Sequence, residues 1–364
     1  MTLMYIVGMY SFFALTCKPK ETNPSNFTHA EKPAANPVIK ADSTLSFFCP
    51  ATQKQVKWQK ADVFNPAAII RNDTLFVIYR CKDNPKAYLG GRTSRLGLAY
   101  SLDGVEFTKY PEPVLYPAAD TFAQWDYPGG CEDPRIVKSP TGTYILTYTS
   151  WNQKTARLSI ATSRDLIHWE KKGPAFMRAY NGKFLNHWSK SGSIVCEWIN
   201  DVQIAKKING KYWMYWGEEF VNLAWSDDLI NWYPDVNEKG ELTAVIRTRP
   251  GYFDSRLTEC GPPAMWMEEG VVLLYNGKNA DDERTDNRLP KNTYTVGRVI
   301  FDKENLSKVV SRTDTCLIKP TLAHEISGQY KSGTVFSEGL VRYKGKWLLY
   351  YGTADSFVGL AELK

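Results

Sequence analysis

The feature that most constrains the fold is a hairpin unit that occurs five times along the chain. Each copy has a small or polar residue beside a proline or apolar residue, then a short apolar run, a turn and an aromatic-rich strand. The copies recur at intervals of about 60 to 80 residues, and self-similarity at a roughly constant period is the signature of repeat architectures. They span Phe64 to Arg80, Cys131 to Trp151, Ile199 to Glu218, Cys260 to Gly277 and Ser337 to Asp355.

A second element fills the gaps between these hairpins. Ser163–Trp169 reads SRDLIHW, Ser226–Trp232 reads SDDLINW, and Ser101–Phe107 is a looser copy. Each predicts a turn at the aspartate followed by an outer strand, so one unit holds about four strands. The sequence therefore predicts an all-β fold, a five-bladed β-propeller formed by one domain over residues 45–364. A β-sandwich is the alternative, but it does not explain five matching units.

The first residues predict export. Residues 1–17 contain an apolar run that is too short to span a membrane and is typical of a secretory signal. The run ends in Ala-Leu-Thr-Cys17, which resembles a bacterial lipobox and predicts membrane attachment through a lipid on Cys17. Residues 18–44 are rich in Pro, Asn, Thr, Ala and Lys and predict a disordered tether. We expect a bacterial protein in the periplasm or attached to a membrane as a lipoprotein.

Composition narrows the classes of partner. The net charge of +6 is spread along the chain without a basic stripe, which argues against nucleic-acid binding. The four histidines form no HExxH pattern and the cysteines form no CxxC, so we expect neither a metal nor another cofactor. The 12 Trp and 21 Tyr residues suit packing between blades and stacking on sugar rings.

The repeat predicts where chemistry gathers. In a propeller the innermost strand of each blade lines the central channel, so equivalent positions converge there. The residues expected near the axis are Asn65, Asp133, Asp201, Pro262 and Gly339.

Several carboxylates fall at or just beyond the ends of these strands. Asp133, Glu218, Glu259 and Asp355 would meet in one funnel, with Arg80 as their counter-charge. Carboxylates in an aromatic pocket suit glycoside cleavage, in which one acid protonates the leaving oxygen and one base activates water. Tyr148 and Asn276, at or just beyond the ends of the second strands, are predicted substrate contacts.

Five stretches together resemble glycoside hydrolase family 130, the family of mannoside phosphorylases and β-mannosidases. They are the FNPA start with Arg80, the GCEDPRI run, the INGKYWMYW strand, the CGPPA run and the terminal YYGTADSFVGLAEL. The resemblance covers all five units in order, from about Phe64 to Leu363. It implies a five-bladed propeller and an inverting attack on a β-mannoside.

The resemblance also implies roles for single residues. Asp133 matches the family's proton donor, which acts directly or through a hydroxyl of the bound mannosyl unit. Asn65, Arg80 and Asp355 match positions that hold the mannose being released. These assignments follow from the resemblance and not from the repeat spacing.

Departures from the family's phosphorylases indicate the hydrolase branch. Phosphorylases of the family typically have His-Arg at the end of the strand in the third unit and Tyr-His-Gly in the fourth unit. A phosphate dianion needs basic groups at this place. This chain has Glu218 and Glu219 in the first place and Asn276 in the second. Glu218 and Glu259 match the glutamate pair of the branch similar to β-1,2-mannosidases. Glu219 stays an alternative base, although alternation along a strand lets only one of the two neighbours face the channel.

The sequence thus predicts an inverting exo-β-mannosidase acting on β-1,2-linked manno-oligosaccharides. Asp133 is the predicted acid, Glu218 the base, and Glu259 helps to place the water. Three alternatives remain at this point: a β-mannoside phosphorylase of the same family, an arabinanase-like propeller glycosidase, and a non-catalytic sugar-binding propeller.

Overall fold

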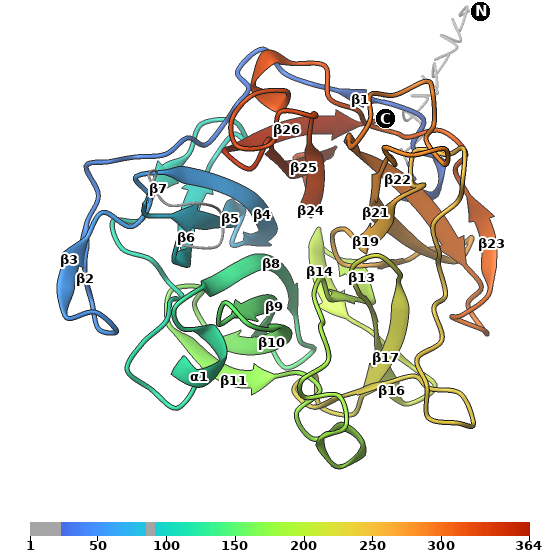
Figure 1. The fold of residues 1–364 in the computed structure, drawn as a ribbon, viewed down its shortest axis with the longest axis horizontal. Coiled ribbons are helices and arrows are strands. Elements are labelled where there is room, and N and C mark those ends of the chain that lie inside the picture. The colour runs from blue at the N-terminus through green and yellow to red at the C-terminus, as the bar shows by residue number, and fades with distance from the viewer. Residues whose placement is uncertain (1–22, 85–91) are drawn as a thin grey trace, which may run out of the picture.

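The computed structural model describes residues 23–84 and 92–364, so the predicted signal segment and Cys17 lie outside the described residues. The described part is nearly all β (Figure 1). Its helical segments are short: η1 (Pro24–Asn26), α1 (Ala123–Asp126), η3 (Ala179–Gly182) and η4 (Ala323–Glu325). No helix in this part of the chain is long and apolar enough to cross a membrane.

The strands fall into five groups that follow the sequence repeat, and Figure 1 shows these groups around a common centre. The first group is β4 (Asp62–Arg71), β5 (Thr74–Lys82), β6 (Ser94–Ser101) and β7 (Thr108–Lys109). The second is β8 (Gly130–Lys138), β9 (Tyr144–Trp151), β10 (Ala156–Ser163) and β11 (Trp169–Pro174). In both groups neighbouring strands pair antiparallel in chain order.

The remaining groups are less regular. The third is β12 (Ser193–Ile194), β15 (Lys207–Ile208), β16 (Lys211–Trp216), β17 (Asn222–Ser226) and β18 (Trp232–Pro234), with a hairpin of β13 (Cys196–Ile199) and β14 (Val202–Ala205) inserted after β12. The fourth is β19 (Leu257–Cys260), β20 (Met265–Trp266), β21 (Val271–Lys278), β22 (Tyr294–Phe301) and β23 (Val309–Arg312). The fifth is β24 (Val335–Tyr343), β25 (Lys346–Thr353) and β26 (Phe357–Leu363). A separate hairpin consists of β2 (Phe47–Cys49) and β3 (Lys54–Val56).

Apolar packing joins the groups in a ring. Five clusters of buried side chains each lie between two consecutive groups, and one of them joins the first group to the last. In that cluster Val77 and Tyr79 of β5 pack with Val341 of β24 and Tyr350 of β25. The strands among the described residues form no closed sheet, because hydrogen bonding divides them into separate sheets.

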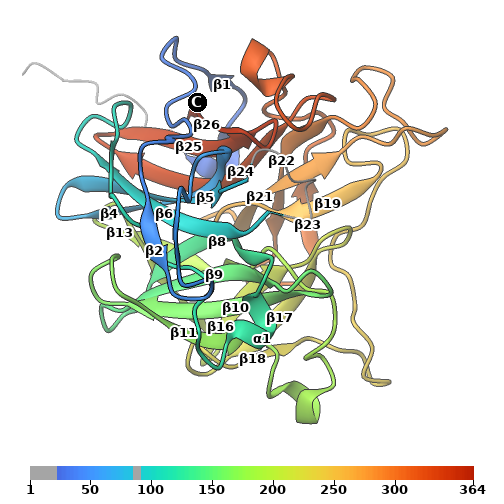
Figure 2. The same ribbon diagram turned by 60° about the vertical axis from the view of Figure 1, so that its left-hand side comes forward.

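The stretch predicted as a disordered tether is ordered from residue 23 onward. Strand β1 (Ala30–Glu31) pairs antiparallel with β26 and completes the fifth group (Figure 2). Phe27 is buried and packs edge-on against Trp347, and Ile39 is buried as well. Few but well-placed apolar side chains therefore anchor a segment whose overall composition indicates disorder.

The predicted alignment of the third unit is wrong. The inner strand that pairs with β16 is β12, and Val202 instead belongs to the inserted hairpin. Asp201 lies in the turn of that hairpin, where its partly exposed carboxylate is 3.6 Å from Arg342. The hairpin places it beside Arg342 of β24 and not beside Asp133.

Candidate active site

Backbone bulges place three polar side chains at the inner strands. The pairing register of β4, β8 and β24 shifts at Asn65, at Asp133 and at Glu338. A bulge leaves its extra residue out of the ladder and re-aims its side chain, which is why bulges recur beside active sites. Asn65 and Asp133 also have positive φ values of 47° and 51°, a backbone conformation that few non-glycine residues adopt. In the fifth unit the residue brought into the site is thus Glu338 and not its neighbour Gly339.

Asp133 is held as a carboxylate by donors from the first group. The amide of Asn65 donates to Oδ1 at 2.8 Å, and NH1 of Arg80 donates to the same atom at 2.9 Å. Arg80 also pairs with Glu132, which accepts from Ser94 at 2.9 Å. Burial alone would raise the pKa of Asp133, but Arg80 and other donors and cations lower it well below its ordinary value. An acid role for Asp133 therefore requires the bound sugar to change this environment.

Glu218 and Glu219 point to different partners. Glu218 follows the end of β16, accepts a hydrogen bond from Nε1 of Trp188 at 2.7 Å and lies 3.8 Å from the ammonium of Lys190. Glu219 pairs with Arg256 at 3.0 Å, and its side chain is 50% exposed. Of these two glutamates, the structure brings Glu218 to the other site carboxylates.

Glu259 lies on β19 with 4% of its surface exposed. The hydroxyl of Ser191 donates to its Oε1. Burial and the negative charge of Glu218 raise the pKa of Glu259 to about 7, although Lys190 and Arg135 oppose the shift. Two glutamates near one another with different environments are a common basis for dividing proton-transfer roles.

Lys190 was not predicted and links the two halves of the site. Burial would lower its pKa, but Glu218, Asp133 and Glu259 raise the pKa above its ordinary value. A cation that interacts electrostatically with all three carboxylates offsets their mutual repulsion and allows them to lie close together. Ser191, the next residue, was missed too. The sequence spacing could have pointed to Ser191, because it lies 68 residues before Glu259, and Asn65 lies 68 residues before Asp133.

Arg135 was not predicted either, and its side chain links the inner strands. Its guanidinium donates to the backbone carbonyl oxygens of Asp133, Cys260 and Gly261 at 3.0, 2.7 and 3.1 Å. NH1 of Arg135 also lies 3.1 Å from Oε1 of Glu338, a fully buried side chain. Arg135 thereby connects the strand of the predicted acid with that of Glu259.

Asp355 reaches the site from the turn after β25, with a φ of 55°. Burial raises its pKa above the ordinary value, while Lys82 and Arg80 oppose the shift. Burial in turn lowers the pKa of Lys82 to about 8. Gly352 of β25 allows the side chain of Asn65 to lie close to this strand, because a Cβ at residue 352 would be 2.0 Å from Oδ1 of Asn65.

Two predicted substrate contacts, Tyr148 and Asn276, are buried and take part in packing between the groups. Tyr148 is buried in the apolar cluster between the first and second groups, where its ring faces other side chains. The side-chain NH2 of Asn276 donates to the carbonyl oxygen of Ser337 at 3.1 Å. The side-chain oxygen of Asn276 accepts from the N–H of Ser337 at 2.7 Å and from its hydroxyl at 2.9 Å. Asn276 therefore clamps β21 to β24 through both ends of its amide.

One cavity adjoins Glu218. It has a volume of about 660 Å³, and its walls include Trp188, Phe220, Arg247 and Tyr294. Aromatic and basic side chains around an open volume suit a polar ligand such as a sugar.

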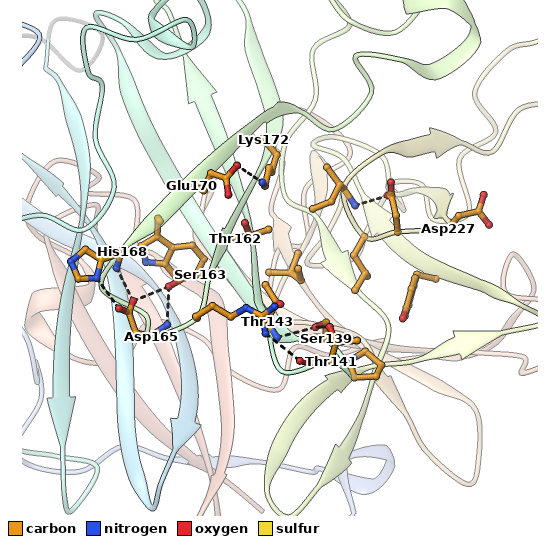
Figure 3. A pocket seen from close by; sticks show the side chains of 18 residues that line it. Ser139, Thr141, Thr143, Thr162, Ser163, Asp165, His168, Glu170, Lys172 and Asp227 are labelled. Carbon is orange, nitrogen blue, oxygen red and sulfur yellow. Dashed lines mark hydrogen bonds and ion pairs between the residues drawn. The ribbon is translucent and has the colours of Figure 1, made fainter.

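A cavity of about 740 Å³ lies between the repeated turns of the second and third groups (Figure 3). Asp165 and His168 line it together with Asp227, and none of the predicted site residues contributes to its wall. Asp165 accepts hydrogen bonds within its own turn, so the polar atoms there serve the turn structure.

In residues 23–84 and 92–364 no group of three or more His, Cys, Asp or Glu residues is arranged to hold a metal ion. Within the same ranges the cysteines are free thiols: Cys49, Cys81, Cys131, Cys196, Cys260 and Cys316.

Comparison with known proteins finds relatives along most of the chain. A family profile described as beta-1,4-mannooligosaccharide phosphorylase matches residues 30–364. The 1,2-beta-oligomannan phosphorylase of Thermoanaerobacter sp. (strain X514) is 34% identical, covering 85% of this chain and 92% of the relative.

Solved structures are similar as well. A glycosyl hydrolase from Bacteroides ovatus is 48% identical with a TM-score of 0.90, covering 94% of this chain and 95% of that chain. A structure from work on glycoside hydrolases that target beta-1,2 mannosidic linkages in Candida mannan is 50% identical with a TM-score of 0.90, covering 93% of this chain and 94% of that chain. These relatives include both phosphorylases and hydrolases, so the chemistry of the site must distinguish the two reactions.

Proposed function

The chain belongs to glycoside hydrolase family 130, and from this premise we propose that it is an inverting exo-β-mannosidase that hydrolyses β-1,2-linked manno-oligosaccharides. One observation carries the choice of hydrolysis. Glu218 and Glu259 interact electrostatically beside Lys190, at the position that the family resemblance assigns to the attacking group. Two carboxyl groups there oppose a phosphate dianion and can accept a proton from water.

In the proposed reaction Asp133 supplies the proton to the glycosidic oxygen, directly or through a hydroxyl of the bound mannosyl unit. Glu218 removes a proton from the attacking water, and Glu259 accepts a second hydrogen bond from that water. Attack from the face opposite the leaving group inverts the anomeric configuration. Asn65, Arg80 and Asp355 hold the mannosyl unit.

The alternative of phosphorolysis comes from the curated relatives, which are phosphorylases. It requires a cationic site for phosphate at the anomeric carbon. Lys190 is cationic, but it already faces Glu218, Glu259 and Asp133. We therefore favour water over phosphate as the nucleophile.

We also propose that the five strand groups are the blades of a five-bladed propeller. Support comes from the ring of apolar clusters, in which the first and fifth groups pack as the other neighbours do. Pairing of β1 with β26 supports this, because it ties the start of the described chain to the last group.

The proposed reaction is tested with β-1,2-mannobiose in phosphate-free buffer and in buffer with inorganic phosphate. We expect mannose in both, with the newly released glycone appearing first as the α-anomer by NMR. β-1,4-Mannobiose serves as the comparison substrate, and we expect slower turnover. Mannose 1-phosphate formed only with phosphate, without turnover in its absence, would overturn the hydrolase assignment.

A further inference from the structure

One short segment contacts both glutamates of the proposed site. This clamp segment comprises residues 188–191, between η3 and β12. Nε1 of Trp188 donates to Oε2 of Glu218 at 2.7 Å, and Nζ of Lys190 lies 3.8 Å from Oε1 of the same carboxylate. The hydroxyl of Ser191 donates to Oε1 of Glu259. Three of four consecutive side chains are thus directed at the two carboxyl groups.

The backbone of the clamp segment is fixed on both sides. The N–H of Gly217 donates to the carbonyl oxygen of Lys190 at 3.0 Å, which ties the segment to the end of β16. The hydroxyl of Ser189 accepts from the N–H of Leu158 at 3.0 Å, which ties it to β10. Ser191 has a φ of 55°, and strain of this kind is tolerated where the surroundings determine the conformation.

The segment treats the two glutamates differently. Glu218 receives an indole N–H on one oxygen, and an ammonium lies 3.8 Å from the other. Glu259 receives a neutral hydroxyl and is more deeply buried. Burial favours the uncharged carboxyl, so the pair is asymmetric before any substrate binds.

Other charged and titratable groups also face this pair. Those that act on Glu259 are Glu218, Lys190, Arg135 and Glu338. Tyr294 is close enough to feel the charge of both glutamates. The cation nearest to Glu218 that the structure records is that of Lys190, so the clamp segment supplies the contrast between the two carboxyl groups.

We propose that the clamp segment is a positioning element that makes Glu218 the base of the pair and leaves Glu259 to hold the attacking water. This inference rests on the proposed hydrolytic function. Trp188 fixes the direction of the Glu218 carboxylate through its indole N–H, and the ammonium of Lys190 lies near the other oxygen. The exposed ring of Trp188 packs edge-on against Trp151 at 5.6 Å, which limits its rotation.

The first test replaces the cation. Lys190→Met removes the positive charge that opposes the raised pKa of Glu259, so the pKa of Glu259 rises further and the fall of kcat at low pH begins at higher pH. Lys190→Arg retains the charge and should retain most of the profile. Lys206→Met is the matched control, since Lys206 pairs with Glu197 at 2.7 Å instead.

The second test removes the indole donor. Trp188→Phe keeps an aromatic ring but loses the N–H that orients Glu218, so kcat should fall by about tenfold or more while KM changes little. Trp188 is 47% exposed, so the midpoint of thermal unfolding should change little. Trp225→Phe is the matched control, because Trp225 stacks on Tyr233.

The outcomes separate this inference from the function. If the wild-type protein releases no mannose without phosphate, the proposed function fails, and the inference fails with it. If the wild type hydrolyses the substrate but Lys190→Met keeps its acid limb and Trp188→Phe keeps its kcat, the clamp inference alone is wrong. If Lys190→Met does not fold, the kcat of Trp188→Phe decides.

Discussion

Replacing Glu218 by glutamine is the sharpest test of the proposed base. The substitution keeps the shape of the side chain, and its amide oxygen still accepts from Trp188, but an amide cannot take a proton from water. A general base contributes about 10²–10⁴-fold, so kcat should fall by that factor, which corresponds to about 3–5 kcal/mol in the barrier. The side chain is 25% exposed and the ion pair with Lys190 is 3.8 Å long, so the free energy of unfolding should change by about 1 kcal/mol or less.

The neighbouring glutamate provides the control. Glu219→Gln removes the same charge one residue away and breaks the ion pair with Arg256. The side chains of Glu219 and Arg256 are 50% and 44% exposed. Exposed pairs contribute about 0–1 kcal/mol, so neither stability nor kcat should change much. Both variants are compared by mannose release in phosphate-free buffer and by thermal unfolding. An inactive Glu219→Gln with an active Glu218→Gln would refute the assignment, and activity in both would make Glu259 the next candidate.

Four further outcomes are expected. Gly352→Ala should lower kcat/KM for the disaccharide, because the added Cβ would lie 2.0 Å from Oδ1 of Asn65 and would displace that side chain. Glu259→Gln should be more thermostable than the wild type by a margin that grows as pH rises from about 4.5 to about 7 and is constant above. The pKa of Glu259 is raised in the folded protein, so the wild type loses stability as this carboxyl group ionises. The glutamine variant has no group to ionise at this position and keeps its stability. Asn276→Ala should cost about 1–3 kcal/mol in the free energy of unfolding while KM stays unchanged, measured by denaturant titration and initial rates. Cys17→Ala should abolish palmitate labelling and membrane attachment if the lipidation prediction is right.

The repeat in the sequence was informative because each unit forms its hairpin from local signals. Turn residues and apolar runs located the inner and second strands in the first, second and fifth groups. The third group failed because INDVQIA has the apolar run and turn of a hairpin unit, and it does form a hairpin, β13 with β14. Local strand propensity cannot tell which partner a strand will pair with.

The predictions for Tyr148 and Asn276 show a different limit of the sequence pattern. Both faces of a strand in these groups pack against neighbouring groups, so alternation along the strand does not separate core residues from ligand-facing residues. Tyr148 and Asn276 are both completely or nearly completely buried. A polar or aromatic residue near a strand end is equally compatible with packing between groups and with sugar binding. Only the partner across the interface, such as Ser337 for Asn276, decides between them.

The residues missed altogether act across long sequence separations. Arg135 bonds to the carbonyl oxygens of Cys260 and Gly261, 125 and 126 residues away, and to that of Asp133 in its own bulge. A repeat alignment compares equivalent positions and gives no information on a side chain that bridges different units. Since the backbones of the predicted acid and of the strand bearing Glu259 are bonded to one guanidinium, their spacing depends on Arg135 as well as on the two strands. The separation of the acid from Glu259, the residue proposed to hold the water, is therefore a property of the assembled inner strands.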